Sequence, residues 1–259
     1  RMKKAIIATS LAAALCASAQ ADTLLGLYIG GHVWDAEVTG SFGEKNTQTN
    51  DITLQEFNFD DQQHGSFYIA LEHPIPLIPN IKIASTTLDT DGQTVITESD
   101  FSFGDIPYPI DTTVNTEFNV SYVDYTFYYE ILDNDLLTLD IGLTAREFEG
   151  DMTITDDIGV LSLSVEEFSA VVPMLYGSVI IGLPLTGLNI FFQGNYTGYD
   201  DSKIQDFQAG ISYSLLDNLA VDLNIELGYK VVKMNIEDID DVYADMEFKG
   251  IFVGATMHF

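Results

Sequence analysis

Residues 250–259 constrain the fold of this chain more strongly than any other stretch. Every second position carries an apolar side chain: Ile251, Val253, Ala255, Met257 and Phe259. Because side chains alternate between the two faces of a β-strand, all five share one face. An unbroken apolar face is typical of a strand in a transmembrane β-barrel, where it contacts lipid. The alternative is an edge strand of a soluble β-sandwich.

The same stretch resembles the C-terminal assembly signal of bacterial outer-membrane barrels. In that signal a glycine precedes two hydrophobic positions spaced by two, and the last of them is aromatic. Gly254, Met257 and Phe259 fit this pattern, whereas Phe252 stands where the signal usually has a polar residue. The resemblance implies that the barrel-assembly machinery handles the chain during insertion.

Residues 1–21 have the layout of a secretory signal peptide. Basic residues precede an apolar run at 5–17 that is too short to span a bilayer, and a small-x-small cleavage site follows at 19–21. We expect a single mature domain at 22–259. Lipidation at Cys16 is the alternative, but the residue before it is a leucine, where a small side chain is required. Cleavage would remove the only cysteine, so no disulfide is expected.

The charge of the chain excludes some classes of partner. Removing the signal peptide leaves 7 basic residues against 40 acidic ones, a formal charge of −33. Such acidity argues against binding to nucleic acid. Mean hydropathy is nevertheless +0.13, so the chain has enough apolar surface to fold. The 13 tyrosines and 16 phenylalanines suit the aromatic girdles of a membrane barrel.

Period-two alternation predicts ten strands, each long enough to cross a membrane at a tilt. They are residues 23–38, 65–73, 80–88, 115–131, 136–148, 165–182, 188–199, 204–215, 219–232 and 244–259. Pro173 predicts a bulge in the sixth strand. Short connections alternate with long acidic ones, as periplasmic turns alternate with extracellular loops in outer-membrane barrels. The prediction is an all-β, antiparallel up-and-down barrel of about ten strands, with eight or twelve as alternatives. It would lie in the bacterial outer membrane among lipids and lipopolysaccharide.

The polar faces of these strands define a candidate lumen. Its charged residues are Glu72, Lys82, Asp124, Glu130, Asp140, Arg146, Asp206, Asp222, Glu226 and Lys230. Because a barrel of about ten strands is narrow and largely filled by side chains, we expect a hydrogen-bonded polar core around the three bases. Carboxylates outnumber bases, so the alternative is a narrow channel that prefers cations and admits small solutes.

Two further functions stay open. His64-Gly65-Ser66 has the His-x-Ser spacing of outer-membrane phospholipases and lipid A deacylases, although the glycines and acid partner of those families are missing. The ten-stranded omptin proteases carry an acidic pair with an Asp-x-His set, which this chain lacks.

Acidic pairs in the predicted loops could bind divalent cations or form an adhesive surface. These pairs are Asp60-Asp61, Asp89 with Asp91, Asp156-Asp157, Asp200-Asp201, Glu237-Asp238 and Asp240-Asp241. We expect a protein that is not an enzyme and has no cofactor.

The run Leu25-Gly-Leu-Tyr-Ile-Gly-Gly-His-Val-Trp34, the long acidic loops and Phe259 together resemble one family. It is a family of uncharacterised outer-membrane β-barrel proteins described from genomes that carry the GlyGly-CTERM sorting system. The resemblance covers the mature chain. It implies an outer-membrane barrel and brings no activity or functional residues.

Overall fold

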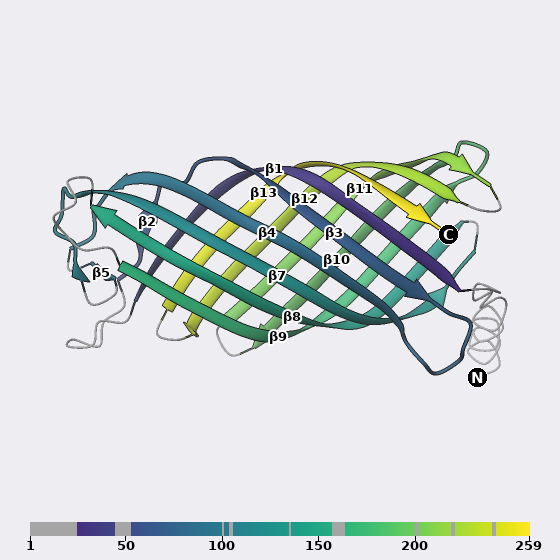
Figure 1. The fold of residues 1–259 in the computed structure, drawn as a ribbon, viewed down its shortest axis with the longest axis horizontal. Helices are drawn as coiled ribbons and strands as arrows, with labels where there is room; N and C mark the ends of the chain where they lie inside the picture. The colour runs from purple at the N-terminus through teal and green to yellow at the C-terminus, as the bar shows by residue number, and fades with distance from the viewer. Residues whose placement is uncertain are drawn as a thin grey trace, which may run out of the picture.

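Ten long strands form a closed antiparallel barrel in the computed structural model (Figure 1). The structure describes residues 25–44, 53–99, 101–103, 106–134, 136–156, 164–199, 202–218, 221–239 and 242–259. The long strands are β1 (Gly26–Glu44), β3 (Gln62–Glu72), β4 (Asn80–Val95), β7 (Thr113–Leu132), β8 (Leu137–Asp156), β9 (Ser164–Leu183), β10 (Leu188–Tyr199), β11 (Ser202–Asp217), β12 (Asp222–Ile239) and β13 (Val242–His258). The predicted ten-stranded up-and-down barrel is confirmed. The predicted signal peptide lies outside the described residues and stays a prediction.

The barrel closes where the last strand pairs with the first. β1 and β13 are paired without interruption from Tyr28 opposite His258 to Glu44 opposite Val242. Beyond β13, Phe259 continues the ladder: the Leu27 N–H donates to its carbonyl at 3.2 Å, and its N–H donates to the Leu27 carbonyl at 3.0 Å. Closure joins the first and last strands of the sheet, as a strand protein needs in a bilayer. Among the described residues, no helix is long and apolar enough to cross a membrane.

Several strands extend further than predicted, at the end away from the short turns. β1 reaches Glu44 instead of residue 38, β4 reaches Val95 instead of 88, β8 reaches Asp156 instead of 148 and β12 reaches Ile239 instead of 232. The predicted loop positions of acidic residues are therefore partly wrong. Asp89 and Asp91 belong to β4, Asp156 belongs to β8, and Glu237 and Asp238 belong to β12, so these residues lie in strands and not in loops. Asp157, Asp200, Asp201, Asp240 and Asp241 lie outside the described residues.

An exchange between the two faces of a strand accounts for this error. β7 shows the exchange, although its residues 115–131 were predicted as one strand. Near the short turns the outward side chains are apolar or aromatic and the inward ones are polar, but beyond Tyr122 the two roles are exchanged. The outward side chains beyond the exchange are Glu117, Asn119 and Ser121. The inward ones there are Phe118, Val120 and Tyr122. In a sequence, a strand whose polar and apolar faces exchange looks like a strand that ends at the point of exchange.

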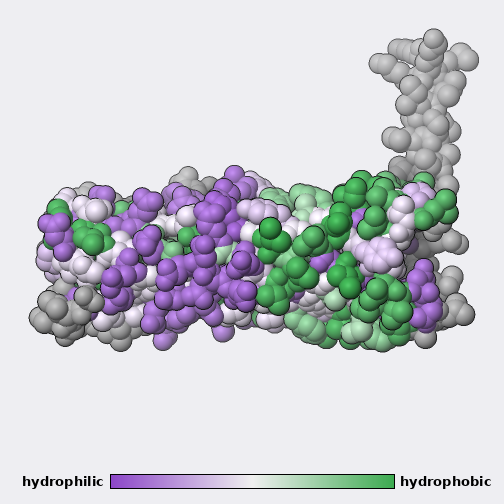
Figure 2. All heavy atoms as spheres, turned by 90° about the horizontal axis from the view of Figure 1, so that it is seen from above, coloured by the Kyte–Doolittle hydropathy of each residue, from purple (hydrophilic) through white to green (hydrophobic). Residues whose placement is uncertain are grey.

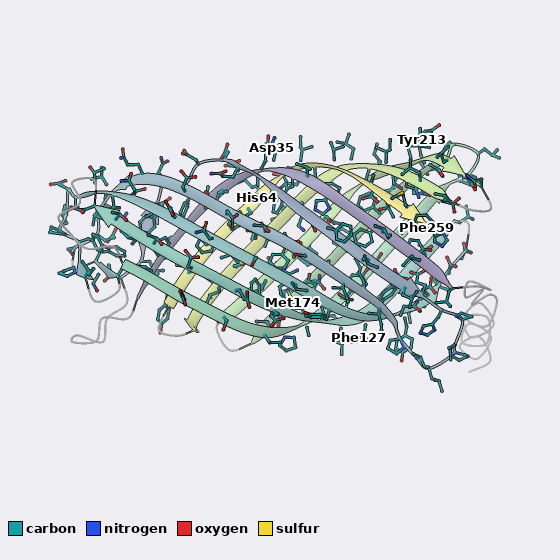
Figure 3. All side chains as sticks on the ribbon, viewed as in Figure 1. Asp35, His64, Phe127, Met174, Tyr213 and Phe259 are labelled. Atoms are coloured by element: carbon teal, nitrogen blue, oxygen red, sulfur yellow. The ribbon has the colours of Figure 1, made fainter. Side chains whose placement is uncertain are left out.

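The same exchange runs around the barrel and divides its outer surface in two. Figure 2 shows a hydrophobic half beside a hydrophilic half. In the hydrophobic half the side chains of Phe127 and Tyr213 point away from the barrel (Figure 3). The upper limit of this apolar belt is marked by Val33, Phe67, Ile83, Val123, Ala145, Val171, Tyr196, Phe207, Val231 and Ile251. Below this limit, β7 and β13 present the roughly nine residues that a tilted transmembrane strand needs. The belt spans the membrane, and the other half projects beyond it.

The interior of the projecting half is filled by apolar side chains, which we call the apolar plug. Its members from the long strands include Trp34, Val38, Phe42, Leu88, Val114, Phe118, Val120, Phe148, Met152, Val232, Met246 and Phe248. Three short strands, β2 (Gln55–Phe57), β5 (Ser102–Phe103) and β6 (Ile106–Pro107), lie at the far end. β2 adds Phe57, β5 adds Phe103, and Phe101 directly precedes β5. The rings of Phe42 and Phe57 stack with centroids 4.1 Å apart. The plug closes the barrel at this end.

A buried glutamine fixes the loop segments that complete the plug. Gln55 Oε1 accepts hydrogen bonds from the Thr97 N–H at 3.0 Å and the Glu98 N–H at 3.2 Å. Gln55 Nε2 donates to the Glu56 carbonyl at 2.7 Å. Tyr108 is also buried and donates to the Ile154 carbonyl at 3.2 Å. Such bonds satisfy the polar groups that the inward-folded loops bury.

Pro173 does not produce the predicted bulge. The register between β8 and β9 runs without a shift through the pair of Ala145 and Pro173. Pairing of β9 with β10 ends at Leu175. Pro173 therefore lies where β9 has lost one neighbour, a position that tolerates a residue without an N–H.

Candidate functional site

A charged layer lies directly beneath the apolar plug, and Arg146 is its centre. Arg146 is 0% exposed. Its Nε donates to Asp124 Oδ1 at 2.6 Å and its Nη2 donates to Asp124 Oδ2 at 2.7 Å, a bidentate pair. Nη2 also donates to Asp206 Oδ2 at 2.7 Å. Asp124 and Arg146 are direct cross-strand neighbours on β7 and β8, whereas Asp206 reaches them across the lumen from β11.

Lys230 and Tyr122 complete this layer. Lys230 Nζ lies 3.4 Å from Asp206 Oδ1, and the Tyr122 hydroxyl donates to Asp206 Oδ2 at 2.9 Å. The Arg146 guanidinium lies 3.8 Å from the centroid of the Tyr122 ring. We use the name charged layer for Asp124, Arg146, Asp206 and Lys230. Two bases and two carboxylates balance, so the layer carries no net formal charge.

A second polar cluster surrounds Lys82, closer to the short turns. Lys82 Nζ donates to Gln193 Oε1 at 3.2 Å and lies 4.2 Å from the centroid of the Tyr68 ring. The hydroxyls of Tyr68 and Thr256 are 2.8 Å apart, and Thr256 donates to Glu226 Oε1 at 2.7 Å. These residues line a cavity of about 230 Å³ beneath the charged layer.

The remaining predicted carboxylates lie lower in the lumen or at its rim. The Tyr128 hydroxyl donates to Glu72 Oε1 at 2.7 Å, and Asn80 Nδ2 donates to Glu130 Oε2 at 3.3 Å. Asp140 is the cross-strand neighbour of Glu130, and its Oδ1 has no hydrogen-bond partner among the residues that the structure describes. Asp222 Oδ2 lies 3.5 Å from His258 Nδ1.

The structure thus gives the predicted lumen residues different partners. Arg146 and Lys230 share Asp206, while Lys82 donates to Gln193 and borders the same cavity as Lys230 and Glu226. Sequence reasoning did not identify Tyr122, Tyr68 and Tyr128 as hydrogen-bond donors in this interior. Their inward alternation with lipid-facing residues is the signal that could have found them.

His64 and Ser66 both lie on the inward face of β3, but their surroundings differ from a hydrolytic site. The His64 ring packs in the plug, 5.5 Å from Trp34 and 5.7 Å from Phe248 between centroids. Its Nε2 makes no hydrogen bond within the described part of the chain. The Ser66 hydroxyl accepts a hydrogen bond from Thr86 at 3.0 Å. A nucleophile activated by histidine requires a hydrogen bond between the two and an orienting partner for the base.

The acidic pairs do not assemble into a recognisable metal centre. Within the described ranges, no group of three or more histidine, cysteine, aspartate or glutamate side chains is arranged to hold a metal ion. Asp89 and Asp91 belong to a strand, and the Asp91 carbonyl accepts a hydrogen bond from the Asp60 N–H at 2.7 Å. Thr90 donates to the Asp60 carbonyl at 2.9 Å. These contacts fasten the segment before β3 to β4.

The residues of the predicted assembly signal have distinct positions in β13 and at Phe259. A Cβ at Gly254 would lie 2.8 Å from the Gly31 carbonyl oxygen and 2.9 Å from His32 Cβ, so this glycine permits close approach of the closing strands. Met257 and Phe259 face outward in the belt. Phe252, the departure from the pattern, is fully buried in the plug. Its ring packs against the rings of His32 and Phe191, with centroids 4.8 and 6.2 Å away.

Comparison with known proteins concerns the fold. No protein-family model and no curated protein sequence matches the chain, so membership of the family named above stays a prediction. The outer membrane protease OmpT from Escherichia coli is similar in structure, with a TM-score of 0.56, 10% identity and coverage of 90% of this chain and 96% of that chain. Two other barrels match with lower TM-scores. Ail from Yersinia pestis gives 0.36 at 10% identity, covering 91% of this chain and 99% of its own. The translocator domain of NalP from Neisseria meningitidis gives 0.42 at 9% identity, covering 98% and 94%.

The likeness to OmpT bears on the fold alone, since identity is 10%. It agrees with the closed antiparallel barrel described above. The chain therefore has the fold of a bacterial outer-membrane β-barrel, which accords with the localisation predicted from its sequence.

Proposed function

We propose that the protein is a sealed structural barrel of the outer membrane, without catalytic or channel activity, that presents a rigid acidic surface outside the lipid. The observation that carries this proposal is the apolar plug. Phe42, Leu88, Phe101, Phe103 and Phe248 are completely buried inside the projecting half. A hydrated cation would have to lose its water in this environment, at a large cost in free energy.

The charged layer supports the same conclusion. In a cation channel, carboxylates along the pathway face the permeating ion. Here Asp124 and Asp206 direct their oxygens to Arg146 and Lys230 at 2.6–3.4 Å. Their charge is neutralised within the layer. The arrangement of these charges therefore fits a cross-link between strands better than a pathway for ions.

Conductance of the refolded protein in a planar bilayer tests this proposal. Folding is verified on the same sample by heat-modifiable migration on gels and by fluorescence of Trp34, which is buried in the plug. We expect no conductance above that of the bare bilayer. Steady cation-selective openings from folded protein would overturn the proposal and revive the predicted channel.

The outer surface favours a second candidate function, an ion-binding or adhesive surface. Above the belt, β4, β7, β8 and β9 present the outward carboxylates Asp89, Asp91, Glu117, Glu147, Glu149, Asp151 and Glu167. The outward bases of the described chain, Lys203, Lys233 and Lys249, lie on the other side, on β11, β12 and β13. Burial, with the nearby charge of Asp151, raises the pKa of Asp89.

Calcium titration tests this second function. If the carboxylates bind the ion, calcium will raise the thermal unfolding midpoint of the wild type and raise it less in Glu149→Gln/Asp151→Asn. Equal shifts in the two proteins would exclude binding at this surface. The matched control is Lys203→Gln, which changes a charge on the opposite side.

A further inference from the structure

Two short turns at the membrane-facing rim hold leucine in a backbone conformation that favours glycine. Leu77, between β3 and β4, has φ of 71°, and Leu185, between β9 and β10, has φ of 67°. A proline precedes each of them, at Pro76 and Pro184. Proline followed by a residue with positive φ is the pattern of a type II turn, in which the second position usually carries glycine.

The first turn is held by several hydrogen bonds. The His73 N–H donates to Asn80 Oδ1 at 3.1 Å, and the Ile75 N–H donates to His73 Nδ1 at 3.2 Å. His73 Nε2 lies 3.3 Å from the Pro79 carbonyl oxygen. The segment also contains Pro74, Pro76 and Pro79. Its shape is therefore fixed, and Leu77 is held in its conformation.

The second turn is built differently but reaches the same result. The Thr186 N–H donates to the Leu183 carbonyl at 3.3 Å, the bond that closes a β-turn. Thr186 Oγ1 donates to the same carbonyl at 2.7 Å and accepts from the Leu188 N–H at 3.1 Å. Two different sets of bonds thus place a leucine at the tip of each turn.

Both leucines project fully from the protein. Leu77 is 92% exposed and Leu185 is completely exposed, while Ile75 and Ile78 beside Leu77 are half exposed. Leucine at this position strains the backbone, and among the described residues its side chain is too exposed to gain packing energy. Glycine would avoid both penalties. A strained residue that gains nothing inside the protein points to a contact outside it.

The apolar belt identifies that contact. The hydroxyl of Tyr129, an outward residue of the belt on β7, donates to the Leu77 carbonyl at 3.0 Å. The turn is therefore attached to the lipid-facing wall of the barrel. In Figure 1 the connection between β3 and β4 extends beyond this wall. Leu183 continues the belt to the foot of the second turn. We propose that Leu77 and Leu185 insert into the membrane leaflet at this rim and anchor the barrel at a fixed depth.

The other two short turns supply a contrast. The connection from β7 to β8 begins with Asp133 and Asn134, and Asn218 follows Asp217 at the end of β11, so neither contains a proline–leucine pair. In the strand order of the barrel, these two connections alternate with the two proline–leucine turns. The anchors therefore lie on well-separated sides of the rim, where they would fix the tilt of the barrel as well as its depth.

Tryptophan placed at the turn tips tests this proposal. Leu77→Trp and Leu185→Trp are compared with Asp217→Trp, an exposed residue at the end of β11. The proteins are refolded into phosphatidylcholine vesicles that contain lipids brominated near the headgroup end of the acyl chain. The single natural tryptophan, Trp34, is buried in the plug and gives a constant background that the wild type measures.

We expect brominated lipid to quench Leu77→Trp and Leu185→Trp at least two-fold more than Asp217→Trp, and aqueous acrylamide to quench them less. If both variants respond to the two quenchers as Asp217→Trp does, the turns lie in water and the proposal is wrong. That outcome would leave a protein partner as the candidate that contacts the two leucines.

Should tryptophan prevent refolding, Leu77→Cys and Leu185→Cys in a Cys16→Ser background carry a spin label instead. Greater collision of the label with oxygen than with a water-soluble nickel complex is then the expected result, and the reverse overturns the proposal.

Discussion

Replacing Arg146 by methionine is the sharpest test of the charged layer. Methionine keeps most of the side-chain volume but removes three charged hydrogen bonds of 2.6–2.7 Å. The two carboxylates that remain are unequal. Asp206 keeps Tyr122 at 2.9 Å and Lys230 at 3.4 Å. Asp124 keeps no hydrogen-bond partner in the described part of the structure, and its side chain is only 8% exposed.

This difference sets the expected magnitude. Breaking a buried ion pair from one side costs about 3–5 kcal/mol, because it leaves a buried charge without compensation. We therefore expect Arg146→Met to lower the free energy of unfolding by about 4 kcal/mol. Asp124→Asn should cost less, about 1.5–3 kcal/mol, because the arginine retains Asp206. The double variant Arg146→Met/Asp124→Asn removes the uncompensated carboxylate as well, so it should cost less than Arg146→Met alone.

Urea unfolding in lipid vesicles, followed by Trp34 fluorescence, measures these values. Lys230 lies 5.4 Å from the centroid of the Trp34 ring, so this tryptophan reports on the charged layer directly. Asp35→Asn, an outward residue of β1 (Figure 3), is the control for loss of a carboxylate and should be neutral. A cost below about 1 kcal/mol for Arg146→Met, or additive effects in the double variant, would refute the reasoning.

Three further predictions follow from the plug and the outer wall. Phe118→Ala should cost about 3–5 kcal/mol through the cavity it leaves, yet produce no conductance, because the Phe59 and Phe248 rings lie 6.5 and 6.2 Å from the Phe118 ring and remain. His64→Leu should change stability by less than about 1 kcal/mol, since one ring nitrogen is already unsatisfied, and should leave any background lipid hydrolysis unchanged. The hydrogen bond with Lys233 lowers the pKa of Glu247 below its usual 4.5. The stabilising effect of this hydrogen bond is therefore present above pH 4.5 and is lost as the pH falls through the lowered pKa of Glu247. Glu247→Gln should be less stable than wild type at pH 7 by under about 1 kcal/mol, and in urea unfolding the difference should shrink as the pH falls below 4.5.

The architecture was predictable because alternation with a period of two is a strong signal over long strands. β10 occupies the predicted residues 188–199, since its outward face is apolar and its inward face, apart from Phe191, is polar up to Asn195. The upper ends of β1, β4, β8 and β12 were missed for one physical reason. Outside the membrane the outer face of a barrel contacts water, so a sealed interior must take the apolar side chains.

The site was only partly predictable. Asp124 and Arg146 are neighbours once the turn between β7 and β8 fixes the register, so their pairing follows from local topology. Asp206 joins them across the lumen, and nothing in the sequence of β11 indicates which opposite strand it reaches. The plug was not predicted, because inward apolar residues such as Phe118 and Val120 have the composition of lipid-facing ones.

The position of Arg146 explains how one barrel combines two interiors. Arg146 lies at the height where the outer surface of β8 changes from Ala145, in the belt, to Glu147, above it. Inside, the environment changes there from polar to apolar. A guanidinium suits this boundary because its edge donates to carboxylates while its flat face packs on an aromatic ring. The edge of the Arg146 guanidinium donates hydrogen bonds to Asp124 and Asp206, and its face packs on the Tyr122 ring. Lysine would supply a charge without that face, so the boundary requires arginine for its shape as much as for its charge.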